Sequence, residues 1–455
     1  MSCEPTSVRD TICAIATPPG TGGIGIVRVS GPGVQQIARQ LLGKLPRPRY
    51  ATLADIPDVS GETIDSGIVL YFPGPASFTG EDVLELQGHG GHFVLQQLIQ
   101  RIQGLGARIA RPGEFSERAF LNDKLDLTQA EAIADLIESG SDAAARAAQR
   151  SLQGVFSRRI NELQARLTDL RVFVEAAIDF PDEEIDFLAE SDVLQGLEDC
   201  QMQLGSLLQE ARQGRLLRDG IVLAIIGRPN AGKSSLLNVL SGQESAIVTE
   251  VPGTTRDVLR EQIELDGIPV HLADTAGIRE TSDRIEAEGV KRARQALETA
   301  DIILLVEDVT APREDRQGLA AELPPGTACI RVENKIDLES ASTGNQTEQG
   351  TSTSFVRISA KTGEGIDELR ARIRDALGVT EQAAGSFSAR QRHISALKRA
   401  GRHIALGAKQ LGENQAGELL AEELRLAKHA MSELNGELLP DDLLGKIFSS
   451  VCIGQ

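Results

Sequence analysis

The segment from Gly227 to Ser234 constrains the fold of this chain more than any other feature. It reads Gly-Arg-Pro-Asn-Ala-Gly-Lys-Ser and matches the phosphate loop, whose glycines allow backbone N–H groups to wrap phosphates. Residues 221–226, directly before it, form a continuous apolar run that is typical of a strand buried on both faces of a parallel sheet. The pattern therefore predicts a strand, a phosphate-binding turn and a helix, as in an α/β nucleotide-binding domain.

Four further apolar runs predict the rest of this sheet. Segments of helix length separate them, and such alternation is typical of a doubly wound α/β domain. The runs are residues 270–273, 302–306, 329–332 and 355–358.

Short motifs predict how phosphates and a magnesium ion are held. Lys233 is expected to reach the outer phosphates, and the Ser234 hydroxyl to ligate Mg²⁺. Thr255 stands where a first switch loop is expected to complete the Mg²⁺ shell. Asp274, which follows a predicted strand, is expected to hold Mg²⁺ through water, while the N–H of Gly277 senses the γ-phosphate.

Two more motifs predict that the base is guanine. In Asn334-Lys335-Ile336-Asp337, the Asp337 carboxylate can accept hydrogen bonds from guanine N1–H and from its exocyclic amine, a donor pair that adenine lacks. Ser359-Ala360-Lys361 follows the next predicted strand, at the usual position of a guanine-contacting loop. The full set of predicted nucleotide contacts is Asn230, Ala231, Gly232, Lys233, Ser234, Ser235, Thr249, Thr254, Thr255, Asp274, Thr275, Ala276, Gly277, Asn334, Lys335, Asp337, Ser359 and Ala360.

The residue after Asp274-Thr275-Ala276-Gly277 bears on how GTP is hydrolysed. Many GTPases place a glutamine there to orient the attacking water, but this chain has Ile278, which cannot hydrogen-bond water. Glu286, a few residues on, is a candidate for that role. Equally, it suits a glutamate placed at a helix N-terminus by the helix dipole.

The regions on either side of residues 216–379 have different patterns. Residues 1–120 contain strand-like runs at 12–16, 24–29, 68–71 and 83–87, bounded by Gly and Pro. From about residue 125 the chain is helical, and apolar residues from Ile160 to Ala177 recur at steps of three and four. A helical pattern resumes after about residue 386. The economical interpretation is one helical domain interrupted by the α/β domain, although two separate helical domains would give the same pattern.

Charge and cysteine content restrict the partners and the compartment. The chain carries 47 basic and 66 acidic side chains, a formal charge of −19, so a nucleic-acid partner requires a local basic patch or a second protein. The five scattered cysteines indicate reduced thiols. No secretory signal and no apolar run of about 18 residues is present. We therefore expect a cytoplasmic protein without a membrane span.

Two weaker patterns have simpler explanations. Residues 20–25 fit a dinucleotide-binding glycine pattern, but they lead into a strand-like run where that motif requires a helix, which favours a tight turn. His89 and His92 have a spacing that suits a metal, but no third ligand is evident nearby, so a turn or a pocket role is favoured.

Together with motifs elsewhere, these residues resemble the MnmE (TrmE) family of tRNA-modifying GTPases over essentially the whole chain. The additional motifs are Ala16-Thr17-Pro18-Pro19-Gly20, Phe78-Thr79-Gly80-Glu81-Asp82, residues 112–120, Leu125-Asp126-Leu127 and Cys452-Ile453-Gly454. The resemblance implies a homodimer that binds tRNA and works with an FAD-dependent partner of the MnmG (GidA) type. The implied reaction adds an aminomethyl-type group, such as carboxymethylaminomethyl, to C5 of the wobble uridine, using a 5-formyl- or methylene-tetrahydrofolate.

The resemblance also implies roles for particular residues. A K⁺ ion that stimulates hydrolysis would be held by Asn230, Thr249, Val251 and Thr254, and Glu286 would orient the water. Arg28, Glu85 and Lys124 would bind the folate, although each also suits an ordinary surface or salt-bridging role. Cys452 is a candidate for the modification chemistry, or a small apolar residue at a helix end. The family commonly ends in Cys-Ile-Gly-Lys, whereas this chain ends in Gln455.

The predicted architecture is multidomain, α/β together with α+β. It comprises an α+β folate-binding and dimerisation domain (1–120), a discontinuous helical domain (121–215 and 380–455) and an inserted Ras-like GTPase domain (216–379). The main rival is a GTPase switch or assembly factor, for example a ribosome-associated one, without modification chemistry. A second alternative is a free-standing folate-dependent aminomethyltransferase with GTPase regulation.

Overall fold

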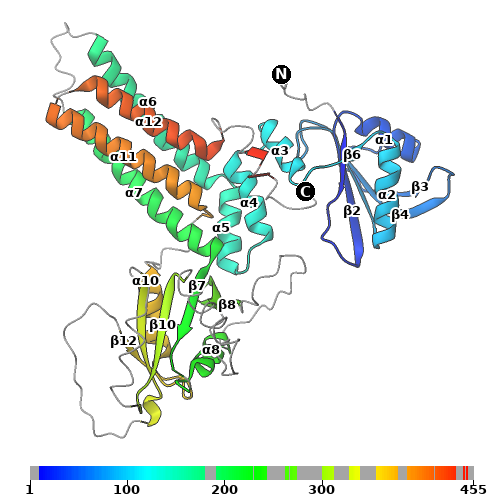
Figure 1. Cartoon of the computed structure of the whole chain (residues 1–455). Coiled ribbons are helices and arrows are strands. Elements are labelled where there is room, and N and C mark those ends of the chain that lie inside the picture. Colours follow the sequence, from blue (N-terminus) through cyan, green and yellow to red (C-terminus); the bar gives the residue numbers. More distant parts are fainter. Residues whose placement is uncertain are drawn as a thin grey trace, which may run out of the picture. The chain divides into compact units, whose positions relative to one another are not determined.

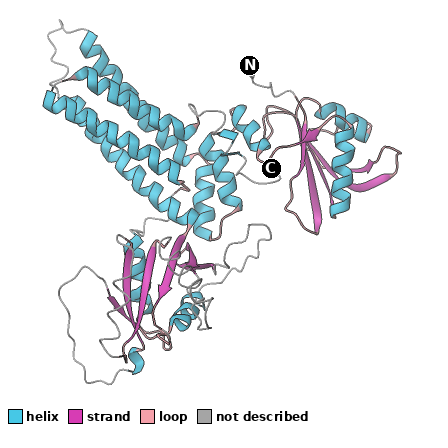
Figure 2. Cartoon of the chain, viewed as in Figure 1, coloured by secondary structure: helices cyan, strands magenta, loops and turns pink. Residues whose placement is uncertain are grey.

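The computed structural model describes residues 10–179, 191–242 except 229, 262–273 except 266, 300–311, 327–338, 355–377, 387–436 except 415, and 444, 445, 447 and 448. The chain forms two compact units (Figures 1 and 2). The first comprises Met1–Ile137, Ser151–Gln201 and Arg399–Gln455, and the second comprises Glu138–Arg150 and Met202–Lys398. This division into two units does not test the boundaries of the four predicted segments, which remain predictions.

The N-terminal part of the first unit is a six-stranded sheet with helices packed on one face. Its strand order is β3-β4-β5-β2-β1-β6, antiparallel except for the pair of β1 with β6. Helices α1 and α2 share one apolar core with the strands, which confirms the α+β prediction. The elements are β1 (Ile12–Ile15), β2 (Gly22–Ser30), α1 (Val34–Leu42), β3 (Thr52–Pro57), β4 (Thr63–Phe72), β5 (Val83–Gly90), α2 (His92–Gly104) and β6 (Arg108–Ile109).

The helical part of the first unit brings together two distant stretches of sequence. Helix α6 packs on α12, Gln164 Nε2 donates to Ser432 Oγ (3.1 Å), and Asn435 Nδ2 donates to Asn161 Oδ1 (2.6 Å). These contacts confirm a single interrupted helical domain. The helices are α3 (Glu114–Leu121), α4 (Leu127–Ile137), α5 (Asp142–Leu152), α6 (Val155–Asp179), α7 (Ser191–Asp219), α11 (Gln391–Asn414) and α12 (Gly417–Asn435), of which α5, α7 and α11 continue into the second unit.

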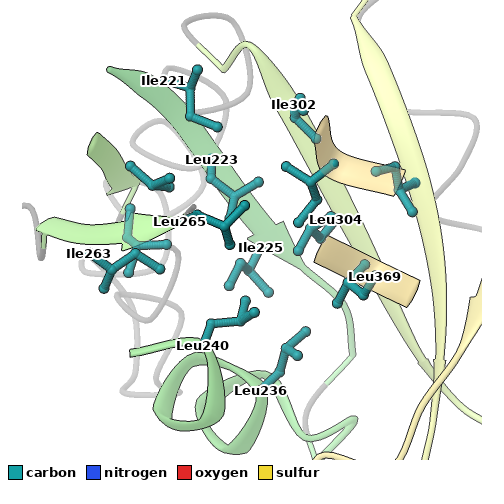
Figure 3. Close-up of a cluster of buried hydrophobic side chains, with 14 of the residues drawn as sticks. Ile221, Leu223, Ile225, Leu236, Leu240, Ile263, Leu265, Ile302, Leu304 and Leu369 are labelled. Atoms are coloured by element: carbon teal, nitrogen blue, oxygen red, sulfur yellow. The ribbon is translucent and has the colours of Figure 1, made fainter. Parts of the chain in front are cut away.

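The second unit contains the predicted doubly wound sheet. Its strand order is β12-β11-β10-β7-β9-β8, with β8 antiparallel at one edge and the other strands parallel. Apolar side chains of β7 and β10 meet those of α8 and α10 in one core (Figure 3). The elements are β7 (Ile221–Ile226), α8 (Lys233–Gly242), β8 (Gln262–Leu265), β9 (Ile268–Ala273), β10 (Ile302–Asp308), β11 (Ala328–Asn334), the 3₁₀ turn η3 (Ile336–Leu338), β12 (Phe355–Arg357) and α10 (Ile366–Leu377).

None of the helices that the structure describes is long and apolar enough to span a bilayer.

Candidate functional site

The predicted nucleotide-binding residues gather at one edge of the parallel sheet. The carboxyl ends of β7, β10, β11 and β12 meet there, which is where open α/β sheets bind ligands. Gly227, the first residue after β7, lies so close to β10 that a Cβ would be 2.2 Å from the Val306 carbonyl oxygen. Only glycine therefore lets the phosphate loop leave the sheet at this point.

The backbone of the phosphate loop turns sharply before α8. Asn230 and Gly232 have positive φ values of 63° and 94°, in the left-handed region that favours glycine and tolerates asparagine. At Gly232 a Cβ would lie 2.2 Å from Asn334 Nδ2, so no side chain fits there. Ser234 and Ser235 follow in the first turn of α8, whose N-terminal N–H groups and dipole favour an anion.

Lys233 lies across the phosphate loop. Its Nζ donates to the carbonyl oxygens of Gly227 (2.6 Å) and Arg228 (2.9 Å). Burial lowers the pKa of the Lys233 ammonium, because desolvation disfavours its charged form. A bound phosphate would favour the charged form again, so the lysine suits a site whose natural occupant is anionic.

Asn334 joins the phosphate loop to the predicted guanine loop. Its side chain is 2% exposed; Nδ2 donates to Ala231 O (2.9 Å), and Oδ1 accepts from Ala360 N (3.0 Å). The two loops are far apart in the sequence, and this one amide holds both. Asn334 is therefore a positioning residue, which satisfies two buried backbone groups.

Asp337 lies at the open side of this edge. It is exposed, and the Ser359 hydroxyl donates to its Oδ1 (2.6 Å). Among the described residues no donor to its Oδ2 is found, so this oxygen can accept a hydrogen bond from a ligand. Ser359 also accepts from Thr362 N (3.2 Å), which shapes the loop after β12. The arrangement fixes one oxygen of a carboxylate and presents the other.

Asp308, at the end of β10, is a residue that the sequence reasoning missed. It accepts from Lys335 Nζ (2.5 Å) and from Thr310 Oγ1 (2.6 Å), and Lys335 has a φ of 70°. Burial alone would raise the pKa of Asp308, but these hydrogen bonds hold it below its ordinary value. Its position two residues after the apolar run 302–306 was the available signal, because strand ends of this sheet carry the site.

Several predicted residues lie outside the described part of the chain. They include most of the predicted Mg²⁺ and K⁺ ligands and both predicted catalytic residues, whose roles remain predictions. They are Thr249, Val251, Thr254, Thr255, Asp274, Thr275, Ala276, Gly277, Glu286 and Cys452.

The structure brings two of the three predicted folate residues together on neighbouring strands. Arg28 on β2 is directly opposite Glu85 on β5, and Arg28 Nε donates to Glu85 Oε1 (2.9 Å). The guanidinium carbon also lies 5.7 Å from the ring centroid of Phe78 and 5.8 Å from that of Phe115. Since only Nε is used, both terminal nitrogens of Arg28 remain without a partner among the described residues.

Lys124, the third of these residues, lies beside the loop that carries Phe78. A Cβ at Gly80 would be 3.3 Å from Lys124 Cγ, and Asn122 Nδ2 donates to Thr79 O (2.7 Å). The Lys124 ammonium has no hydrogen-bond partner in the described structure. Unpaired cationic nitrogens next to aromatic rings and a half-buried carboxylate fit a ligand with a flat heterocycle and an acidic tail.

A buried ionic network explains the motifs at residues 78–82 and 112–120. Arg118, 1% exposed, donates to Glu114 (3.0 Å), to both oxygens of Glu81 (3.1 Å each) and to Asp10 Oδ1 (2.8 Å). Arg108 adds a two-pronged contact to Glu114 (2.8 and 2.5 Å). The network fixes the loop between β4 and β5 against α3, and therefore positions the surroundings of Arg28.

His89 Nδ1 lies 2.8 Å from Asp65 Oδ1, and the described residues contain no group of three potential metal ligands. Gly22–Gly25 already belong to β2 (Gly22–Ser30), so no helix follows the glycines, as expected, but the prediction of a tight turn is wrong for these four residues.

At the end of the described chain, Phe448 packs against Phe120 of α3, with ring centroids 5.8 Å apart. The Phe448 side chain is buried and shares a small apolar cluster with Leu127 and Ala130 of α4. The segment that leads to Cys452 is thus anchored to the first unit four residues before the thiol.

Comparisons with known proteins cover almost the whole chain. The family model described as the MnmE helical domain matches residues 127–452, and that described as the GTP-binding protein TrmE N-terminus matches residues 11–124. The tRNA modification GTPase MnmE of Yersinia pseudotuberculosis serotype IB (strain PB1/+) is 55% identical over 455 residues, 99% of this chain and 100% of that protein. The protein of the same name from Pectobacterium carotovorum subsp. carotovorum (strain PC1) is 54% identical over the same shares.

Two solved structures each resemble part of the chain. The G domain of the T. maritima FeoB iron transporter is 27% identical and covers 34% of this chain and 98% of its own, with a TM-score of 0.26. An Aquifex aeolicus Era variant bound to GDP and aluminium fluoride is 28% identical and covers 41% and 67%, also with a TM-score of 0.26.

Proposed function

The chain belongs to the MnmE (TrmE) family of GTP-hydrolysing tRNA modification proteins, and we propose that its GTP hydrolysis drives modification of the wobble uridine at C5. The proposed group is of the aminomethyl type, such as carboxymethylaminomethyl, and its one-carbon unit comes from a 5-formyl- or methylene-tetrahydrofolate. An FAD-dependent protein of the MnmG type is the proposed partner. The proposed assembly contains a homodimer of this chain.

The nucleotide half of the proposal is supported by the geometry at the sheet edge. The phosphate loop and α8 offer backbone N–H groups and Lys233 to the phosphates, and Asp337 presents a free oxygen toward a guanine donor pair. Because Asn334 bonds both loops, binding at either one is coupled to the shape of the other. Ser234 is the described residue proposed to hold Mg²⁺, which would neutralise charge on the phosphates.

Hydrolysis is proposed to need a charge supplied beside the phosphates. Asn230, held at a positive φ in the phosphate loop, is proposed to ligate K⁺ together with Thr249, Val251 and Thr254. A monovalent cation there would take the place of an arginine finger. Glu286 is proposed to orient the attacking water, since Ile278 cannot do so.

The folate half is supported by the unpaired nitrogens of Arg28 and Lys124. We assign these cations to the glutamate carboxylates of the folate, and Glu85 to the amino and N–H groups of its pterin ring. When bound, the folate would supply the one-carbon unit. Cys452 is proposed to take part in the modification chemistry.

The observation that carries the proposal is that a chain 55% identical over 455 residues to a tRNA modification GTPase has, besides its guanine-nucleotide edge, a second group of cations, Arg28 and Lys124, with unused donors. An assembly factor would have no use for that second group of cations. Folate binding therefore separates the two functions.

The experiment is equilibrium binding of 5-formyl-tetrahydrofolate to the full-length chain and to Lys124→Gln. We expect Lys124→Gln to bind at least about tenfold more weakly, because a charge-assisted contact is worth about 1.5–3 kcal/mol. Lys409→Gln, which removes an exposed cation paired with Glu413 on α11, is the charge-matched control. Absence of folate binding by the unaltered chain would favour the GTPase switch.

A further inference from the structure

One stretch of this acidic protein carries only positive charge. From Thr11 to Ala54 the sequence contains five Arg or Lys residues and no Asp or Glu, although 66 of 455 residues are acidic, about one in seven. Four of these cations lie within eleven residues, at the end of α1 and in the loop that leads to β3. We call Arg39, Lys44, Arg47 and Arg49 the basic cluster.

All four side chains of the basic cluster are exposed and unpaired. None forms an ion pair with a carboxylate among the residues that the structure describes, and their contacts are with neutral groups. Asp82, the acidic group near Arg39, is instead held by Gln35 Nε2 (2.8 Å) and by Gly74 N (2.9 Å). Elsewhere in the described chain, exposed cations such as Arg146 and Arg425 have acidic partners one helical turn away.

The loop that carries the basic cluster has a fixed shape. Gly43 ends α1 with a φ of 74°, Arg49 N donates to Tyr71 O (2.8 Å), and Tyr50 N donates to Arg47 O (3.2 Å). The Arg47 guanidinium carbon lies 5.5 Å from the centroid of the Tyr50 ring. These contacts hold the backbone of the loop in place, so a ligand would not have to order it.

We infer that the basic cluster is a surface that binds the phosphate backbone of tRNA. This inference rests on the proposed function, which names tRNA as the substrate but does not say where on this chain the tRNA binds. A chain with a net charge of −19 repels RNA over most of its surface, so attraction requires a local positive patch. Charge complementarity favours phosphates over a protein partner, because unpaired exposed arginines and lysines contact phosphate without matching shape.

The test measures the binding of a fluorescently labelled tRNA transcript to the full-length chain between about 50 and 200 mM salt. The variant is Arg39→Gln with Lys44→Gln and Arg47→Gln; Arg49 is kept because its guanidinium bonds the Ala76 carbonyl. The control is Arg372→Gln with Lys409→Gln and Arg425→Gln, which removes the same charge from helix-surface ion pairs.

Log affinity decreases as log salt increases, and we expect this dependence to be less steep in the variant, by up to about 3 in the magnitude of the slope. Each lost phosphate contact contributes about 0.7–0.9. Affinity at about 100 mM salt should fall at least about tenfold, and the control should stay within about twofold of the unaltered chain. Arg39→Lys with Arg47→Lys keeps the charge and should keep both the affinity and the slope. GTP hydrolysis should be unchanged in every variant.

Equal losses in the variant and the control would overturn the inference, because net charge would then explain the effect. An unaltered slope in the variant, or a loss of binding to the flavoprotein partner alone, would assign the cluster to another occupant and also overturn it. Failure of the unaltered chain to bind tRNA would reject the inference and would also count against the proposed function. The other outcomes concern the basic cluster alone and do not affect the proposed function.

Discussion

At the residue scale, Asn334 and Asp337 have separate roles although they are three residues apart. Asn334 is buried and bonds two backbone groups of the site, whereas Asp337 is exposed and has one oxygen bound to Ser359. The buried Asn334 side chain therefore holds the protein's own backbone, whereas the exposed Asp337 side chain is available to a ligand. The motif was predicted from the sequence, but only the structure distinguishes these roles.

Asp337→Asn should exchange the preferred base. An asparagine offers an N–H donor where the carboxylate accepted, which mismatches the guanine amine and matches the carbonyl of xanthine. We expect kcat/KM for GTP to fall at least about 100-fold, since the bond from the guanine amine becomes a donor–donor mismatch and the bond from N1–H loses its charge, and XTP to become the better substrate. Asp375→Asn, an exposed change on α10, is the control. Unchanged use of GTP would contradict the assigned role.

Glu114 makes the stability of the N-terminal part of the first unit depend on pH. Burial alone would raise its pKa, but hydrogen bonds from Arg108, the Arg111 N–H and Arg118 lower it from 4.5 to about 2. Because the folded pKa lies below the unfolded one, the stabilisation is complete above about pH 4.5 and is lost as the pH falls to about 2. That shift corresponds to about 3 kcal/mol.

Glu114→Gln should therefore lower the free energy of unfolding by about 3 kcal/mol at pH 7, measured by urea denaturation. The difference from the unaltered chain should shrink steadily between about pH 4.5 and 2. Glu117→Gln on the same helix removes a carboxylate paired with the exposed Arg111, and should cost at most about 1 kcal/mol. A constant difference across this pH range would rule out the ionic network as its source.

At the scale of elements, the central strands β7 and β10 of the second unit were predictable because they are buried on both faces. The apolar run at residues 221–226 coincides with β7, whereas β3 and β8 were missed. In β3 burial alternates along the strand, but the apolar Leu53 lies on the exposed face (79% exposed) while Ile56 is fully buried, so the apolar residues of this edge strand do not follow the alternation. The four-residue β8 is too short for a pattern, and its hairpin is fixed by a distant bond from Ser141 Oγ to Gly267 O (2.7 Å).

Two glycines of α7 allow a paired test of helix packing. A Cβ at Gly214 would lie 1.8 Å from the Phe387 carbonyl oxygen, whereas a Cβ at Gly205 would meet nothing within 4 Å. Gly205→Ala should stabilise the chain by about 0.5–1 kcal/mol, because alanine is the better helix former. Gly214→Ala should destabilise it by about 1–3 kcal/mol, because backbone must move. Thermal unfolding of both variants measures this; equal shifts would contradict the close approach.

At the scale of the whole molecule, the sequence left open whether the helical stretches form one domain. Periodicity identifies which face of α6 is apolar but not which helix covers it. The pairing with α12 depends on buried polar contacts such as that of Gln164 with Ser432, which no local pattern reveals. Likewise, motifs predicted the nucleotide loops, but Asp308 and the Arg118 network act through residues distant in the sequence.

The central claim is that this chain couples GTP hydrolysis to tRNA modification. The most direct test supplies it as the only copy of its function in a bacterium that lacks it, followed by mass spectrometry of the wobble-uridine nucleosides from digested tRNA. We predict restored modification with the unaltered chain and none with Lys233→Ala, which removes the ammonium that lies across the phosphate loop. Unmodified wobble uridine, despite intact GTP hydrolysis and normal levels of the flavoprotein partner, would contradict the claim and favour a GTPase switch.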